Sequence, residues 1–245
     1  MKYLLILSCF LFAFVGWSED IRNGEQLEYY ESGQLKFKGN YIDGKAEGEW
    51  LWYNDNGKLS SKYNFKDGKE DGEFLYYYDN GQLEYESNYK GGKKDGKWLW
   101  YYENGQLEEK SNYKDGKAEG EYLEYFLNGQ LSSKSNYKDG KLEGESLLYY
   151  ENGQLKDKTN YKDGKVEGEK LWYHENGQLK TKSNYKNGKV EGGKRLWYYE
   201  NGQLNHKYNY KDGKLEGEWL QYYENGQLAK TKIYKDGKLI ETITP

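Results

Sequence analysis

The residues that most often carry catalysis are few in this sequence and do not converge. Its two histidines, His174 and His206, stand at different positions of a repeated pattern, where other copies have an aromatic or a variable residue. A general base or metal ligand works with partners held around it, and the sequence supplies none at a recurring distance from either histidine. We therefore expect neither histidine to act as a base or a ligand.

The acidic residues do not form a recognisable site either. The aspartates lie in short turns flanked by lysines, without the Asp-x-Asp-x-Asp-Gly spacing of a calcium loop. Lysines alternate with acids and the formal net charge is −4, which disfavours nucleic acid as a partner. The sequence thus predicts a protein that is not an enzyme, with no cofactor, no metal and no nucleic acid. The turn aspartates are Asp43, Asp67, Asp115, Asp139, Asp163, Asp212 and Asp236.

The elements that must position every side chain are repeats of 24 residues. In Gly144–Glu167 two glycine turns, Asn-Gly-Gln-Leu and Asp-Gly-Lys, separate runs rich in tyrosine and leucine. About nine copies follow one another from Gly24, and the only irregular step is one of 25 residues between Gly177 and Gly202. Such a period indicates a repeat architecture. The aromatic content of 18% argues against disorder, despite a charged fraction of 32%.

Asn-Gly and Asp-Gly between such runs are typical of β-hairpins with type I′ turns, because both central residues tolerate a positive φ. Two turns in each repeat predict two strands, so the chain is expected to be all-β. We predict an elongated, single-layer antiparallel meander of tandem hairpins with about nineteen strands. A β-bulge at the Glu-Gly-Glu glycine would absorb the surplus length of the longer strand, and the extra residue at Glu191–Gly193 falls there.

Counting outward from Asn152-Gly153 places Tyr150 opposite Leu155 and Leu148 opposite Asp157. Leucines and tyrosines that recur in every copy are expected to form ladders that pack each repeat on the next.

The positions beside the first leucine of each copy vary, and they contain all the tryptophans after Trp17. Six of these side chains, from three successive copies, should form one aromatic patch. They either cover the glycine row and stiffen the sheet or form a platform for a ligand. Ser146 and Lys170 occupy equivalent positions, which predicts that replacing the tryptophans costs little stability. The candidate binding patch consists of Trp50, Trp52, Phe74, Tyr76, Trp98 and Trp100.

Met1–Ser18 lies outside the repeats and has the pattern of a secretory signal peptide. Lys2 precedes the apolar run Tyr3–Val15, small residues precede a cut before Glu19, and the run is short for a membrane span. Cys9 leaves a lipoprotein as an alternative. Cleavage would leave residues 19–245 as a single repeat domain, closed by a capping strand and without cysteine for a disulfide.

The motif in Tyr101–Gly120 resembles the bacterial variant of the MORN repeat, found in proteins called YwqK-type antitoxins. The resemblance extends from Gly24 to about Leu239. It implies a twisted meander of β-hairpins and a role in protein scaffolding or contact with membrane lipids. Export would separate this chain from a cytoplasmic antitoxin.

The expected function is that of an exported, non-catalytic interaction or scaffold module at the bacterial cell envelope, whether periplasmic, at the surface or secreted. Protein is the expected partner. The alternatives are a glycan- or peptidoglycan-binding protein that stacks tryptophans on sugar rings, and an antitoxin- or immunity-type protein. Direct contact with membrane lipids stays open, although the negative net charge does not favour it.

Overall fold

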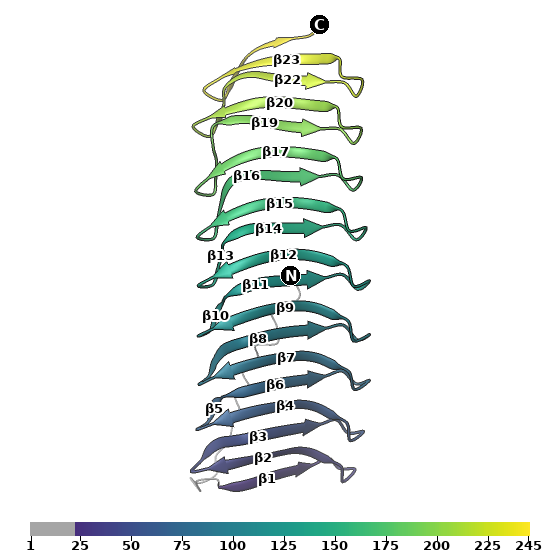
Figure 1. Cartoon of the computed structure of the whole chain (residues 1–245), viewed down its shortest axis with the longest axis vertical. Coiled ribbons are helices and arrows are strands. Elements are labelled where there is room, and N and C mark those ends of the chain that lie inside the picture. The colour runs from purple at the N-terminus through teal and green to yellow at the C-terminus, as the bar shows by residue number, and fades with distance from the viewer. Residues whose placement is uncertain (1–22) are drawn as a thin grey trace.

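The computed structural model describes residues 23–245, and the signal peptide predicted at 1–18 lies outside them. These residues form one open antiparallel sheet, in which hairpins follow one another in chain order along a single long axis (Figure 1). The strands are β1 (Gly24–Tyr29), β2 (Leu35–Ile42), β3 (Lys45–Tyr53), β4 (Leu59–Lys66), β5 (Lys69–Glu70), β6 (Gly72–Tyr77), β7 (Leu83–Lys90), β8 (Lys93–Tyr101), β9 (Leu107–Lys114), β10 (Lys117–Ala118), β11 (Gly120–Tyr125), β12 (Leu131–Lys138), β13 (Lys141–Leu142), β14 (Gly144–Tyr149), β15 (Leu155–Lys162), β16 (Lys165–Tyr173), β17 (Leu179–Lys186), β18 (Lys189–Val190), β19 (Gly193–Tyr198), β20 (Leu204–Lys211), β21 (Lys214–Leu215), β22 (Gly217–Tyr222), β23 (Leu228–Lys235) and β24 (Lys238–Ile243).

The all-β meander predicted from the repeat is confirmed. The sheet has 24 strand segments, and five long strands are each divided in two, as β5 and β6 are; 24 less these five divisions gives nineteen. Each division falls beside the glycine at the Glu-Gly-Glu position of the repeat, and the undivided β16 has its irregularity at the same place, since its pairing with β15 shifts between Thr159 and Tyr161. Gly168 adopts a φ of 77° there, so the predicted bulge is present and depends on a residue without Cβ.

The Asp-Gly turns are type I′, as predicted. Asp163 and Gly164 have φ values of 51° and 78°, and the flanking Lys162 and Lys165 pair directly. A left-handed conformation at two successive residues matches the twist of the flanking strands.

The Asn-Gly turns are not type I′, which corrects the sequence-based assignment. Only Gly153 has a positive φ, of 82°; its N–H donates to Tyr150 O at 2.9 Å, and Tyr150 N–H donates to Gln154 O at 2.8 Å. This is a three-residue loop, a type I turn closed by a glycine bulge. Asn152 stabilises it because its Oδ1 accepts the N–H of Gln154 at 2.9 Å.

The wider loop shifts the register only beside the turn. Tyr149 rather than Tyr150 lies opposite Leu155, whereas the predicted pair of Leu148 with Asp157 is present. Residues on the remainder of each hairpin therefore face as the sequence count places them.

The recurring residues at both turns bind the next repeat. Tyr150 Oη donates to Tyr173 O at 2.9 Å, and Asn152 Nδ2 donates to Glu175 O at 3.0 Å. At the other turn Glu143 Oε2 accepts the N–H of Asp163 at 2.9 Å. The recurring spacing of these turn residues thus serves mainly to join neighbouring repeats.

The recurring first leucines lie on one face of the sheet among charged residues. Leu51 is opposite Lys62, which pairs with Glu49 at 2.8 Å and with Glu73 at 3.8 Å. The leucines of this row are half-buried, apart from Leu27, which is exposed. Full burial occurs on the opposite face, among the variable residues.

Candidate functional site: an aromatic sheet face

Two adjacent rows of side chains run across β2–β9 on the face opposite the leucines, because paired residues of antiparallel strands share a face. The inner row contains, in order across the strands, Trp50, Tyr63, Phe74, Ser87, Trp98 and Ser111. The outer row contains Phe37, Trp52, Ser61, Tyr76, Tyr85, Trp100 and Glu109. The six residues of the aromatic patch alternate between these rows.

The inner row is the packed core of the molecule. Trp50, Phe74 and Trp98 are only 8%, 5% and 7% exposed. Small serines lie between large rings, and Ser87 is fully buried beneath its neighbours. This burial contradicts the expectation that replacing Trp50 or Trp98 costs little stability.

Gly39 makes room for the first of these rings. A Cβ on Gly39 would stand 2.2 Å from the Trp50 ring, so the indole lies directly over the backbone of β2. The contact also explains how Trp50 is buried in a sheet with only one layer.

The three patch residues of the outer row are more accessible than those of the inner row. Trp52, Tyr76 and Trp100 are each half-buried, and each lies against an aromatic ring of a shorter strand. The centroids are 4.8 Å apart for Trp52 and Phe37 and 4.3 Å apart for Trp100 and Tyr85. Such ring pairs contribute about 0.5–1.5 kcal/mol beyond the area they bury.

Aromatic residues of the short strands, which sequence reasoning did not single out, join the patch together. Tyr63 contacts both Phe74 and Tyr76, at 5.1 and 5.4 Å between centroids, and Tyr85 contacts Tyr76 at 5.6 Å and Trp98 at 5.3 Å. The signal in the sequence is their position opposite the variable residues of the long strand.

Burial sets the electrostatics around Trp98. Lys94 Nζ lies 3.4 Å from the centroid of the indole, a cation–π contact, and burial lowers the pKa of this lysine. Burial also raises the pKa of the Glu109 carboxyl, and it raises the pKa of Tyr89 to about 12. Tyr89 therefore stays neutral at physiological pH.

The same face turns polar further along the chain. Ser135 and Ser146 share a hydrogen bond of 2.8 Å between their hydroxyls. Thr159 donates to Asp157 Oδ1, and Lys170 Nζ lies 3.2 Å from Asp157 Oδ2. Asp157 and Thr159 are buried although the sheet has one layer.

Each histidine has a structural environment. His174 occupies the position of Tyr150 in the previous repeat, and its Nε2 lies 3.0 Å from Tyr198 O, the bond that a tyrosine hydroxyl makes elsewhere. His206 stacks between Trp197 and Trp219 at centroid distances of 5.3 and 5.7 Å, and burial lowers its pKa. Each imidazole ring therefore makes a contact that holds the sheet together, a hydrogen bond for His174 and ring stacking for His206.

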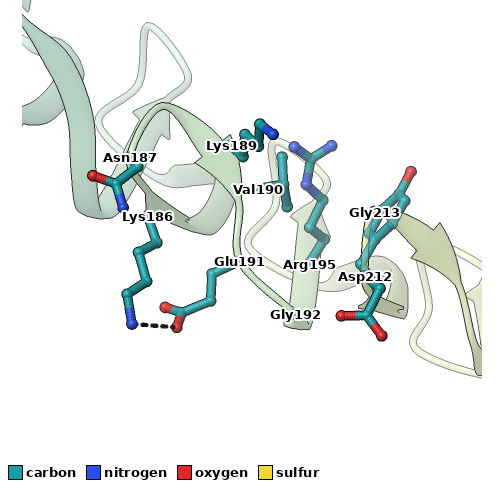
Figure 2. Close-up of a pocket in the computed structure, with 10 residues that line it drawn as sticks. Lys186, Asn187, Lys189, Val190, Glu191, Gly192, Arg195, Asp212 and Gly213 are labelled. Atoms are coloured by element: carbon teal, nitrogen blue, oxygen red, sulfur yellow. Dashed lines mark ion pairs between the residues drawn. The ribbon is translucent and has the colours of Figure 1, made fainter.

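The one irregular repeat produces a hollow, which sequence reasoning did not foresee. Glu191, Gly192 and Arg195 line it from the divided strand β18–β19, and Asp212 and Gly213 line it from the Asp-Gly turn that follows (Figure 2). The available signal was the 25-residue step between Gly177 and Gly202, which places the bulge but does not by itself predict a hollow.

Between residues 23 and 245 no three His, Cys, Asp or Glu side chains are grouped to hold a metal ion. Over the same residues, no helix is long and apolar enough to span a membrane.

Nine segments of the chain match the family model described as "MORN repeat variant", and together they make up more than half of its length. The segments are residues 22–43, 46–67, 70–90, 94–115, 118–139, 142–163, 166–187, 191–212 and 215–236. Their boundaries follow the observed hairpins.

No curated protein sequence matches the chain. Among solved structures, a crystal structure of TcdB2-TccC3-TEV is similar over 86% of this chain and 14% of that chain, with 13% identity and a TM-score of 0.22. The Tc holotoxin pore of Photorhabdus luminescens is similar over 86% of this chain and 12% of that chain, with 14% identity and a TM-score of 0.22. The chain therefore spans about one seventh or less of those proteins, and at these scores the likeness carries no argument.

Proposed function

The chain belongs to the MORN repeat variant family, and on that premise we propose that it is an exported, non-catalytic scaffold that binds protein at the bacterial cell envelope. Repeats of this family are generally non-catalytic and serve interaction with protein or membrane. The proposed contact surface is the aromatic patch, whose outer-row members Trp52, Tyr76 and Trp100 keep part of their rings accessible.

One observation carries this proposal: large aromatic rings lie on a sheet face that no second layer covers in residues 23–245. Half-buried aromatic side chains held rigidly by their neighbours are the anchors that protein interfaces favour. In this arrangement Trp50, Phe74 and Trp98 support the surface from within, and the outer row makes the contact.

Charge favours protein over membrane as the partner. Lysine and glutamate pair on the opposite face, as in Lys62 with Glu49, and the formal net charge is −4. A lipid-binding surface usually carries an excess of lysine and arginine beside its apolar residues.

The test is a binding assay with purified chain against envelope protein fractions, purified peptidoglycan and anionic vesicles. Trp52→Gln with Trp100→Gln removes two of the accessible rings and should weaken retention by the protein fraction at least tenfold. The fold should tolerate both changes, since Gln221 already occupies the equivalent position in a later repeat. Trp172→Gln is the matched control, because Trp172 lies in the same row outside the patch and is 40% exposed.

Each outcome points to one function. Retention by peptidoglycan alone, lost in the double variant, would favour the glycan-binding alternative, and retention by vesicles alone would favour a membrane role. If the double variant binds its protein partner as tightly as the parent does, the patch is scaffold and the proposal fails.

Export has its own test. The mass of the chain recovered from an expressing bacterium should correspond to a mature protein that begins at Glu19. Recovery of a cytoplasmic chain that retains Met1–Ser18 would contradict the proposed location at the cell envelope.

A further inference from the structure

The turns that contain Asp-Gly bind the preceding repeat through two backbone amides. At Asp163–Gly164 the first N–H donates to the Glu143 carboxylate at 2.9 Å, and the second donates to Leu142 O at 2.9 Å. Seven turns at this position of the repeat between residues 67 and 237 make both bonds, five of them Asp-Gly and the other two Gly91-Gly92 and Asn187-Gly188, with the carboxylate accepting at 2.8–3.3 Å. In the described chain, Asp212–Gly213 is the turn in this stretch that makes neither bond.

The extra residue of the irregular repeat accounts for the difference. Glu191 N–H still donates to Asn184 O at 2.9 Å, so the strand begins normally, and the additional glycine follows at once. The Glu191 carboxylate, which should bind the next turn, lies instead 4.0 Å from Lys186 Nζ (Figure 2). The amides of Asp212 and Gly213 are left at the surface, since both residues are exposed.

The surroundings of these two amides are cationic and open. They border the hollow of about 810 Å³, which is also lined by Lys186, Lys189 and Arg195. The Nε of Arg195 is buried without a hydrogen-bond partner, while a terminal nitrogen of its guanidinium donates to Tyr185 Oη at 3.3 Å. The hollow is thus lined by three cationic side chains and two acidic ones, Glu191 and Asp212.

We propose that this hollow binds a carboxylate group supplied from outside the chain. The other repeats show which ligand these amides accept, because there a glutamate or aspartate carboxylate of the same chain occupies the position. Backbone N–H donors together with arginine form charge-assisted hydrogen bonds with a carboxylate. The group comes either from an acidic peptide or from a free organic acid.

The site is distinct from the aromatic patch, which lies on β3–β8, and it goes beyond the proposed scaffold function. Its test therefore succeeds or fails independently of that function. It needs a probe that reports on individual amides.

The full chain, labelled with ¹⁵N, should be titrated with an acetylated Glu-Gly-Glu amide peptide and, separately, with succinate. We expect the amide signals of Asp212 and Gly213 to shift and saturate with at least one probe. Those of Asp163 and Gly164, whose acceptors are already in place, should not move. Saturation with the peptide alone identifies a peptide source, and saturation with succinate identifies a free acid; either supports the carboxylate site.

Two variants complete the design. Deleting Gly192 restores the 24-residue spacing, so Glu191 should occupy the amides and the titration should lose its saturable shift while the fold is kept. Arg195→Gln should weaken binding about tenfold, the usual factor for one charge-assisted hydrogen bond. No saturable shift, equal shifts at both turns, or binding that survives the Gly192 deletion would overturn the proposal.

Discussion

Two stretches of the same sheet face differ sharply in how they are stabilised. Across β2–β9 the inner row buries indole and phenyl rings, of which Phe74 is 5% exposed. Across β12–β17 the equivalent positions hold residues such as Ser146 and Lys170, and a hydrogen-bonded network around Asp157 replaces the rings. Both stretches have the same turns and the same register.

The repeat motif and the packed core are therefore separate features of this chain. Recurring residues such as Tyr150 and Glu143 bind neighbouring repeats through backbone atoms at the turns. Burial depends on the variable rows, which exchange large rings for polar networks without altering the frame. A frame of this kind leaves one face free to vary, as an interaction surface requires.

Removing a ring from each stretch gives the largest expected effect. Trp98→Ala should lower the free energy of unfolding by about 3–5 kcal/mol, because the ring is buried against Tyr85, Tyr89 and Tyr113. Trp172→Ala, at an exposed site in the polar stretch, should cost less than about 1 kcal/mol. Denaturant unfolding followed by circular dichroism measures both, and equal losses would refute the division into two stretches.

The polar network in the second stretch can be broken in a graded way. Asp157→Ser leaves Lys170 half-buried without its partner and should cost about 1–3 kcal/mol. Adding Lys170→Ser recreates the serines of the previous repeat, Ser133 and Ser146, and should recover part of that loss. If the double variant is less stable than Asp157→Ser alone, the pair does not work as a unit.

The fold could be predicted from sequence because the same turn and strand pattern recurs in about nine copies. Period, turn glycines and bulge position all follow from backbone geometry, and each is visible in the spacing. The Asn-Gly turn was misassigned because Asn-Gly suits both a two-residue turn and a three-residue loop, and the side-chain bond of Asn152 decides between them.

The candidate site was harder to predict because burial on a single sheet depends on both strands. The sequence identified Trp50 and Trp98 but not Tyr63 and Tyr85, which lie between the patch residues and close the gaps. The role of Ser87, a small side chain fully buried between large rings, follows from its burial and not from its residue type. The hollow beside Gly192 follows from one residue that breaks the count, and its consequence appears only in hydrogen bonds lost 20 residues later.

Removing or adding one hydrogen bond between neighbouring repeats should change stability modestly and in opposite directions. Tyr150→Phe removes the hydroxyl bond to Tyr173 O and should cost about 0.5–1.5 kcal/mol. Phe126 occupies the position of Tyr150 in the preceding repeat. Phe126→Tyr should raise the free energy of unfolding by a comparable amount, because the new hydroxyl can donate to the next repeat. Thermal unfolding of both variants tests the pair, and a loss in Phe126→Tyr would show that the bond does not transfer between repeats.

The smallest expected effect concerns pH and His206, which stacks between Trp197 and Trp219 outside both stretches. Burial between Trp197 and Trp219 lowers the pKa of this histidine, so the folded protein holds its proton less tightly than the unfolded chain does. Its contribution to stability is therefore complete above the unfolded pKa of about 6.5 and is lost as the pH falls through the lower, folded value. Melting curves between pH 7.5 and pH 5 should show a loss that His206→Phe reduces, because phenylalanine keeps the stack and cannot be protonated. The buried rings of β2–β9 contain no histidine, so they make no contribution of this kind. An identical pH dependence in His206→Phe and the parent would assign the effect to the carboxyl groups instead.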